Sequence, residues 1–412
     1  MLNGLRIPMP TREGLYFVSV LLFVMGGAVA RELNLLIVLA GMMIGPLVFH
    51  ARMVLLALRR LSVSRRLPRR IQAGESLHVR IGIANGRRQL GAWLLRARDR
   101  ITYRNGQGDG GIPPTAVDVA VPLVEPAGET WVSYRAHLTR RGLYEFGPIT
   151  VSTRFPLGLL ECSRRFDARQ ELIVCPRLGR MTAEWDRLTQ GGPTGTQAAL
   201  ARQGLTEDEF HGLREWRPGD SRRWVHWRTS ARLSTLSVKQ FERKRHRSLA
   251  LLLDLRMPAR PTETDRVRLE LVVSIAATAL TDIARQGLAR VTLAIAGARP
   301  GCWSGAASPR FVDELIDRLA AVEGGSGATL AEAARMLVER WPGGAPGVVL
   351  STRPMPADAF GSVNRSAPAE LFGGAAGTAV EARRLDRVTW IDAGRRDLDR
   401  FFQWSHGPVD RA

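Results

Sequence analysis

The sequence contains almost no lysine, since only Lys239 and Lys244 stand among its 59 basic residues and the rest are arginine. Acidic residues are also few, 39 in total, so the net charge is +20. Such a charge is typical of proteins that bind nucleic acid or anionic membranes. The shortage of lysine, together with abundant Ala, Gly and Pro, indicates a high-GC genome bias instead. The charge alone is therefore weak evidence for a polyanionic partner.

Cysteine and catalytic motifs are scarce as well. Cys162, Cys175 and Cys302 are scattered and show no C-x-x-C spacing, which argues against a disulfide framework or a zinc site and favours reduced thiols. No G-x-S-x-G, H-E-x-x-H or P-loop run is present. His211 and His226 have no Ser or Cys nucleophile with a supporting local signature. We therefore expect no enzyme activity, no catalytic residue and no cofactor.

Two long uncharged runs lie near the N-terminus, Gly14 to Ala30 and Leu33 to Ala51, with only Arg31-Glu32 between them. Each approaches the roughly 20 residues that a membrane helix needs, and the short junction predicts a helical hairpin. The flanking residues are basic: Arg6, Arg12, Arg52, Arg59, Arg60, Arg65, Arg66, Arg69 and Arg70. The positive-inside rule places both flanks in the cytoplasm. Ala28-Val29-Ala30 offers an alternative, a cleaved signal peptide, after which the second run would still act as an anchor.

A chain of 412 residues is too long for one compact domain, so two or three units are expected. Apolar and polar residues alternate at 77–83 and 132–138, and Asn85-Gly86 is a hairpin turn signal. An all-β sandwich is expected over 61–180, after a membrane anchor at 1–60. Predicted strands at 249–253, 291–296, 347–350 and 388–392 alternate with helices at 267–286, 311–322, 330–341 and 398–404. An α/β domain with a mainly parallel sheet is expected over 249–412.

The segment between these domains, 181–248, is expected to be a linker followed by a Trp- and Arg-dense stretch. Pro218-Gly219 is turn chemistry, and Asp220 stands where a helix N-cap would accept bonds from free backbone N–H groups. Trp224, Trp227 and Ala231 recur at helical spacing, which predicts one helix with a small apolar face.

The same stretch resembles the bacterial domain of unknown function 58 family. The residues that carry the resemblance are Arg214, Trp216, Pro218, Gly219, Asp220, Arg223, His226, Trp227, Ser230, Ala231, Arg232, Leu236, Val238 and Glu242. Trp216 stands where the family usually has Tyr, and Val225 where it has Ile. The resemblance extends to Arg140-Arg141-Gly142 and Pro156-x-Gly158-Leu159 at the end of the predicted sandwich.

This resemblance implies a non-enzymatic interaction protein of the bacterial inner membrane, with its soluble domains in the cytoplasm. Family members are often associated with MoxR-type AAA+ ATPases, so the expected role is an adaptor or scaffold for such an ATPase and for other membrane proteins encoded nearby. The implied functional or domain-joining residues are Arg214, Pro218, Gly219, Asp220, Arg223, Trp227, Ala231 and Arg232. Asp220 is expected to hold the helix start and bind an Arg, and Trp227 to anchor the helix.

The final domain resembles a von Willebrand factor type A-like domain, some of which bind a divalent cation through an Asp, two Ser and a Thr. Here Asp254 is present and Thr329 matches the loop Thr, but Leu255 and Arg256 follow Asp254. We expect a degenerate site without a metal, with Asp254 capping a helix or pairing with an Arg.

An alternative function is an electrostatic binder of anionic lipid or nucleic acid through the Arg-rich face. Arginines interleaved with Trp216, Trp224 and Trp227 are able to contact phosphates and stack on bases. The competing interpretation is that these Trp residues pack in the interior, and no known nucleic-acid module is present. Contact with the lipid bilayer is expected, and specific nucleic-acid binding is not.

Overall fold

The computed structural model describes residues 7–31, 34–104, 113–189, 209–217, 220–242, 248–286, 290–325, 327, 330–341, 345–353, 388–394 and 396–404. These residues divide into two units. The first comprises Met1–Arg177 and Ile316–Val322, and the second comprises Leu178–Leu315 and Glu323–Ala412. Apolar N-terminal helices, mixed sheets and a partly parallel sheet together give the expected multidomain layout.

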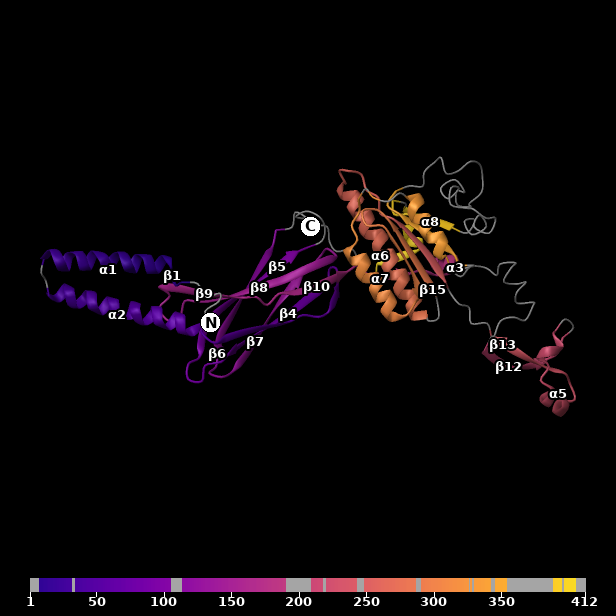
Figure 1. Ribbon diagram of the computed structural model, residues 1–412, viewed down its shortest axis with the longest axis horizontal. Coiled ribbons are helices and arrows are strands. Elements are labelled where there is room, and N and C mark those ends of the chain that lie inside the picture. The colour runs from indigo at the N-terminus through magenta and orange to yellow at the C-terminus, as the bar shows by residue number, and fades with distance from the viewer. Residues whose placement is uncertain are drawn as a thin grey trace. The chain divides into compact units, whose positions relative to one another are not determined.

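Two apolar helices, α1 (Arg12–Arg31) and α2 (Asn34–Ala57), pack side by side in the first unit (Figure 1). Large apolar side chains face outward along both, with Phe23 83% and Leu35 81% exposed. Both helices are long and apolar enough to cross a membrane, as predicted. Lipid solvates such surfaces and water does not, so the pair is consistent with membrane anchoring.

The strands of the first unit form two sheets. The larger sheet runs β1-β9-β8-β10-β3, with β5 beside β8 and β6 beside β5, and the smaller sheet is β2-β4-β7. The bounds are β1 (Met9–Pro10), β2 (Leu61–Arg66), β3 (Arg70–Gln72), β4 (Ser76–Asn85), β5 (Ala92–Tyr103), β6 (Thr115–Val124), β7 (Glu129–His137), β8 (Gly142–Thr153), β9 (Leu160–Phe166) and β10 (Gln170–Cys175). All pairings are antiparallel except that of β10 with β3.

One hydrophobic core is shared by the two sheets. The predicted alternation in 77–83 is confirmed, because Leu77, Val79, Ile81 and Ile83 are all buried in it, together with residues of β5 and β8. The hairpin predicted at Asn85-Gly86 is wrong, since β4 pairs with β2 and β7 whereas β5 pairs with β6 and β8. Asn85 instead ties down the connection between the sheets by donating to the carbonyl of Leu90 at 2.9 Å.

A buried ion pair crosses this core from one sheet to the other. Arg65 on β2 donates to Asp99 on β5 through Nε at 2.9 Å and Nη2 at 2.5 Å, and both side chains are 0% exposed. Tyr134 on β7 donates its hydroxyl proton to the same carboxylate at 2.8 Å. Burial and the charge of Asp99 raise the pKa of Tyr134, so the phenol stays protonated. The Arg65 guanidinium also donates to the carbonyls of Phe146 and Ala168.

The apolar helices are joined directly to the larger sheet. His50 of α2 is fully buried, and its Nδ1 accepts from the Leu157 N–H at 3.3 Å while its Nε2 lies 3.2 Å from the Leu160 carbonyl oxygen. Thr11 begins α1 by accepting from the Gly14 N–H and donates its hydroxyl proton to the Gly158 carbonyl at 2.7 Å. The start of α1 and the C-terminal part of α2 are thereby fixed to the 157–160 segment.

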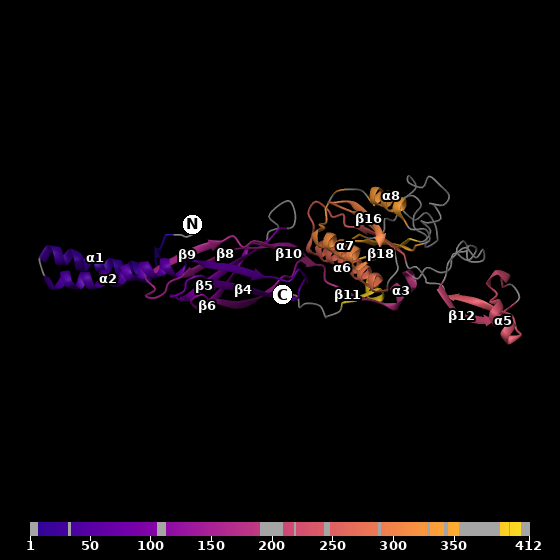
Figure 2. The ribbon, with the colours of Figure 1, turned by 60° about the horizontal axis from the view of Figure 1, so that its bottom comes forward.

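A five-stranded sheet forms the centre of the second unit, in the order β16-β15-β14-β17-β18. Its bounds are β14 (Leu249–Asp254), β15 (Arg290–Ala296), β16 (Gly301–Ala306), β17 (Gly347–Ser351) and β18 (Val388–Asp392). Its helices are α6 (Glu263–Gln286) and α8 (Leu330–Arg340), and α7 (Pro309–Ala321) begins in this unit. α8 packs against β14 and β15, and α6 against β14 and β17 (Figure 2). Every pair in the sheet is parallel except β15-β16, as the predicted mainly parallel sheet requires.

In the second unit one prediction is wrong and two elements were not predicted. The helix expected at 398–404 is a 3-10 turn, η3 (Arg396–Arg400), followed by β19 (Phe402–Trp404), which pairs with β11 (Gly179–Met181). The edge strand β16 is additional to the predicted strands. Inside the expected linker lies a short helix, α3 (Ala183–Thr189), whose Trp185 is buried.

Candidate functional site

The Trp- and Arg-dense stretch forms a small structure of its own, which we call the signature module and which spans residues 209–242. Strand β12 (Glu209–Glu215) pairs antiparallel with β13 (Ser237–Glu242). The connection between the strands carries a 3-10 turn, η1 (Arg222–Trp224), and a short helix, α5 (Trp227–Leu233).

The single helix predicted through Trp224, Trp227 and Ala231 is wrong, because Val225 interrupts it. Val225 is extended, buried, and bridged to Val238 of β13. The next residue, His226, donates its N–H to the Ser237 carbonyl at 2.8 Å. A β-branched residue that gains a strand partner and a buried side chain at this point favours the extended conformation over a helical one.

An Arg–Asp clasp closes the module. Arg214 of β12 donates to both carboxylate oxygens of Asp220, Nη1 to Oδ2 and Nη2 to Oδ1, each at 2.6 Å. The Arg217 N–H adds a third bond to Asp220 at 2.9 Å. These donors, Arg214 first, lower the pKa of Asp220 to about 2. Two parallel bonds to one carboxylate fix its orientation relative to the guanidinium, so the clasp joins Asp220 firmly to Arg214 of β12.

The predicted roles of Asp220 are half right. Its binding to an Arg is confirmed, but it does not hold a helix start. Ser221 caps η1, and His226 caps α5 through Nδ1, which accepts from the Thr229 N–H at 3.3 Å. His226 therefore has a structural, hydrogen-bonding role.

Ser230 is a structural residue that the predicted site did not include. It is 8% exposed, donates to the His226 carbonyl at 3.1 Å and accepts from the Ser237 N–H at 2.8 Å. It thereby connects α5 to β13. Its place between Thr229 and Ala231 in the signature was the one available signal, because a small hydroxyl residue within a motif often bonds to nearby backbone.

The outward surface of the module is apolar and basic. Trp227 is 65% exposed, so the prediction that it anchors the helix is wrong, and Leu233 and Leu236 are exposed too. Arg223, Ala231 and Arg232 are also exposed. Of the eight predicted residues, the structure brings Arg214 and Asp220 into contact and places these four on the surface. Pro218 and Gly219 lie outside the described residues, as does the side chain of His211.

Asp254, at the end of β14, is enclosed rather than open to a cation. It is 1% exposed, and Arg256 donates to its Oδ1 from Nε at 2.7 Å and to its Oδ2 from Nη2 at 3.0 Å. Ser351 adds a bond to Oδ2 at 3.1 Å. The pairing with an Arg that we expected is confirmed. Thr329 falls outside the described residues, and within the described ranges no three His, Cys, Asp or Glu side chains gather as metal ligands.

These features define a class of protein: two apolar N-terminal helices, an all-β part, and an α/β unit whose sequence is preceded by an Arg–Asp-clasped hairpin. Residues 212–351 match the family described as Protein of unknown function DUF58, the family that the signature stretch resembles. The match begins within β12 and ends at Ser351, so it covers most of the signature module and the sheet through β17.

A curated relative supports the same family. The uncharacterised protein YeaD of Bacillus subtilis (strain 168) is 31% identical over 124 residues, which is 30% of this chain and 30% of the relative. The chain thus matches less than a third of that protein's length.

Solved structures resemble only part of the chain. A CARDB domain from Pyrococcus furiosus is 12% identical with a TM-score of 0.16, and it covers 28% of this chain and 94% of its own. A β-glucosidase from Listeria innocua is 16% identical with a TM-score of 0.21, covering 28% of this chain and 16% of its own. A superoxide reductase from Ignicoccus hospitalis is 14% identical with a TM-score of 0.19, covering 27% and 80%. TM-scores this low carry no argument about function.

Proposed function

We propose that the protein is a membrane-anchored, non-enzymatic scaffold that acts as an adaptor for a MoxR-type AAA+ ATPase in a bacterial inner membrane. In this proposal α1 and α2 cross the membrane, the two sheets of the first unit form a β-sandwich, and the α/β unit is a type A-like domain. The soluble parts stand in the cytoplasm, in agreement with the arginines that follow α2.

The observation that carries the proposal is the surface of the signature module. Hydrogen bonds within the module, between Arg214 and Asp220 and between Ser230 and Ser237, hold it in a fixed shape. Its exterior leaves Trp227, Leu233 and Leu236 exposed among arginines. Trp and Arg are the residue types that dominate the binding energy of protein interfaces, and a rigid presentation lowers the entropy lost on binding.

The hydrogen bonds of Asp254, at the carboxyl end of the central strand β14, support a binding role over a catalytic one. A buried carboxylate that is to hold a cation or move a proton needs a free lone pair. Both oxygens of Asp254 are bonded to Arg256, and Oδ2 is bonded to Ser351 as well. The guanidinium neutralises the charge at the place where a type A domain would hold a metal.

The test is capture of the full-length protein from its own cells in mild detergent, with and without ATP. We expect nucleotide-dependent recovery of an AAA+ ATPase, lost with Trp227→Ala. The matched control is Val267→Ala, which truncates another exposed apolar side chain, 60% exposed, on α6. Equal recovery by wild type and Trp227→Ala, or no ATPase in any sample, would refute the adaptor role of this surface.

The exposed arginines of the module favour one alternative, an electrostatic binder of anionic lipid or nucleic acid. Arg217, Arg222, Arg223, Arg228 and Arg232 are all exposed. Binding of a polyanion falls steeply as salt rises, because counterions compete for the arginines. Binding through Trp227 and its apolar neighbours is expected to change little over the same salt range.

A further inference from the structure

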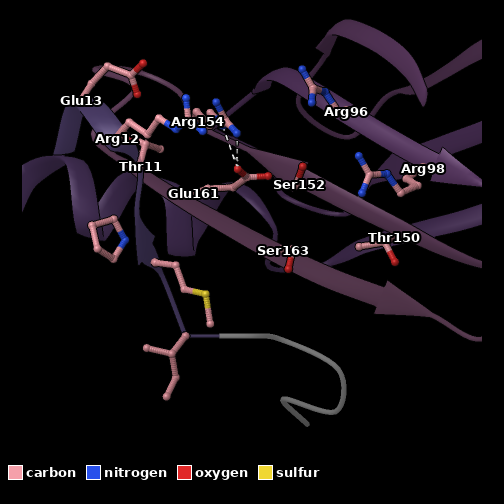
Figure 3. A pocket seen from close by; sticks show the side chains of 13 residues that line it. Thr11, Arg12, Glu13, Arg96, Arg98, Thr150, Ser152, Arg154, Glu161 and Ser163 are labelled. Atoms are coloured by element: carbon pink, nitrogen blue, oxygen red, sulfur yellow. Dashed lines mark hydrogen bonds and ion pairs between the residues drawn. The ribbon is translucent and has the colours of Figure 1, made fainter. Parts of the chain in front are cut away.

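A polar cavity lies on the outer face of the larger sheet, beside the start of α1. Its volume is about 480 Å³, and it is lined by the β1 end, the first residues of α1, and strands β5, β8 and β9 (Figure 3). Four arginines, Arg12, Arg96, Arg98 and Arg154, line it against two glutamates, Glu13 and Glu161. Its wall therefore has a net positive charge.

The strand register determines which side chains form the floor of the cavity. Arg96 on β5 is paired with Ser152 on β8, which is paired in turn with Ser163 on β9. Directly opposed residues of neighbouring strands point to the same face of a sheet. The alternate residues Leu95, Val151 and Cys162 are buried in the core, so the row Arg96–Ser152–Ser163 faces outward into the cavity.

Two of the four guanidinium groups are already paired. Arg154 donates to Glu161 at 2.8 Å, and Arg98 donates to Asp118 at 2.8 and 2.9 Å. Arg12 and Arg96, in contrast, have no hydrogen-bond or ion-pair partner among the described residues, although both line the cavity. Two guanidinium groups and a pair of hydroxyls are thus available to an anion. Guanidinium and hydroxyl donors together match the oxygens of a phosphate ester.

In the proposed membrane setting, this cavity lies next to the bilayer. Arg12 is the first residue of α1, so the apolar span starts immediately beside it. A second cavity of about 300 Å³ shares Arg96, Ser152 and Arg154 and extends to Leu94 and Leu157. Leu94 is 63% and Leu157 49% exposed, and the Leu157 N–H bonds to His50 of α2.

A tryptophan accompanies these exposed leucines. Trp93 is 46% exposed and stacks on Phe155 with ring centroids 6.1 Å apart. Leu94 has a φ of 47°, in the left-handed region that a branched side chain rarely adopts. Tryptophan side chains are enriched in the headgroup layer of membranes, where their rings are partly apolar and partly polar. Beside the charged cavity, this surface offers a place for acyl chains.

We propose that the cavity binds the phosphate group of an anionic phospholipid from the leaflet that α1 enters. Arg12 and Arg96 donate to the phosphate oxygens together with Ser152 and Ser163, and the acyl chains pass over Leu94 and Leu157 toward the helices. The inference rests on the membrane anchoring in the proposed function and is independent of the ATPase partner. The same phosphate chemistry occurs in soluble phosphate, and the apolar surface beside the cavity assigns the site to a lipid.

The test uses the full-length protein in detergent micelles, titrated with phosphatidylglycerol or phosphatidylcholine, with bound lipid counted by native mass spectrometry. We expect phosphatidylglycerol to be retained and phosphatidylcholine to bind more weakly. Arg12→Gln with Arg96→Gln should weaken phosphatidylglycerol binding at least about tenfold, because two charge-assisted bonds are lost. Ser152→Ala should weaken it by a smaller factor.

The matched control is Arg100→Gln with Arg135→Gln, which removes the same charge from exposed residues outside the cavity. Equal loss of lipid in this control and in the cavity variant would overturn the site in favour of general attraction. Competition by inorganic phosphate at concentrations comparable to the lipid would overturn the lipid assignment in favour of a soluble anion.

Membrane sedimentation of the same variants tests the anchoring separately. Protein that remains in the membrane fraction but shows no preference for phosphatidylglycerol overturns the lipid site and leaves the proposed function intact. Protein that is released from membranes by salt overturns both. Unchanged thermal melting of the cavity variant, whose two arginines are exposed, verifies that lipid loss does not reflect unfolding.

Discussion

The protein uses the same Arg–Asp pairing in two settings. Arg65 and Asp99 lie inside the all-β core of the first unit, where both are 0% exposed. Arg214 and Asp220 lie on the signature module of the second unit, where their side chains are 36% and 16% exposed. In both pairs the guanidinium makes two short hydrogen bonds to the carboxylate, one to each oxygen. The two pairs differ in their exposure to solvent, and this exposure determines how much each pair contributes to stability.

In the core, the pair exists at a high desolvation cost that only a complete set of partners offsets. Asp99 has Arg65 and Tyr134, and Arg65 has two carbonyls besides. On the module, water is available to either side chain, so the pair contributes little energy and instead fixes the position of Asp220 relative to β12. The first pair therefore matters for folding, and the second for presenting a surface.

The largest effect is expected from Asp99→Ala. It leaves the Arg65 guanidinium buried without its carboxylate, which costs on the order of 3–5 kcal/mol in the free energy of unfolding. Urea unfolding of the full-length protein in detergent measures it. Asp118→Ala, which removes the exposed partner of Arg98, is the control and should cost about 1 kcal/mol or less. Equal losses in the two variants would show that burial does not distinguish the pairs.

A double variant sharpens the same comparison. Arg65→Met with Asp99→Leu replaces the buried pair by apolar side chains, so no charge is left without a partner. We expect it to be more stable than Asp99→Ala by about 1 kcal/mol or more, since apolar replacements of buried pairs are often well tolerated. A double variant that unfolds as easily as Asp99→Ala would contradict this account, and the hydroxyl of Tyr134 would be the group to remove next.

The module's clasp is expected to respond to acid. The pKa of Asp220 is lowered to about 2 from the usual 3.8, so the clasp is fully formed above pH 4 and is lost as the pH falls toward 2. Amide exchange in 212–217 and 237–239 should accelerate over that window. In Asp220→Asn the exchange should be faster at neutral pH and should lose this pH dependence. Exchange that is identical in both proteins would show that the clasp does not order the hairpin.

The smallest effect on stability is expected from Trp227→Ala. Because Trp227 is 65% exposed, its loss should change the unfolding free energy by less than about 0.5 kcal/mol. A loss of several kcal/mol in the same urea unfolding experiment would return Trp227 to the anchoring role that its helical spacing first indicated.

Elements defined by one local pattern were predictable from the sequence. The apolar helices, the alternation at 77–83, and the elements between 249 and 350 other than β16 follow from periodicity, because each of these elements buries one face. Helical spacing failed at Val225, where a bridge to Val238 outweighed it. The pattern of the last residues gave a helix where β19 pairs with β11, a partner more than two hundred positions away.

Sites built from remote strands were beyond such reasoning. Asp99 meets Arg65 and Tyr134 only because β5 lies opposite β2 and β7 in the core. Arg96, Ser152 and Ser163 become neighbours through strand register alone. In the candidate site, the binding of Asp220 to an Arg was foreseen, but the identity of that residue as Arg214 was not. The exposure of Trp227 depends on how few residues pack over α5.

The bonds of His50 and Thr11 to the 157–160 loop restrict how the sheets move relative to the helices. A domain joined to a membrane helix by a flexible linker rotates freely and samples many positions above the bilayer. Here Arg87 and Arg164 also grip the end of α2, donating to the carbonyls of Leu56 at 2.8 Å and Leu58 at 3.1 Å. In the proposed membrane setting, the sheets of the first unit are therefore rigidly attached to the membrane helices. They rotate only when the helices rotate in the bilayer, and their distance from the bilayer surface stays constant.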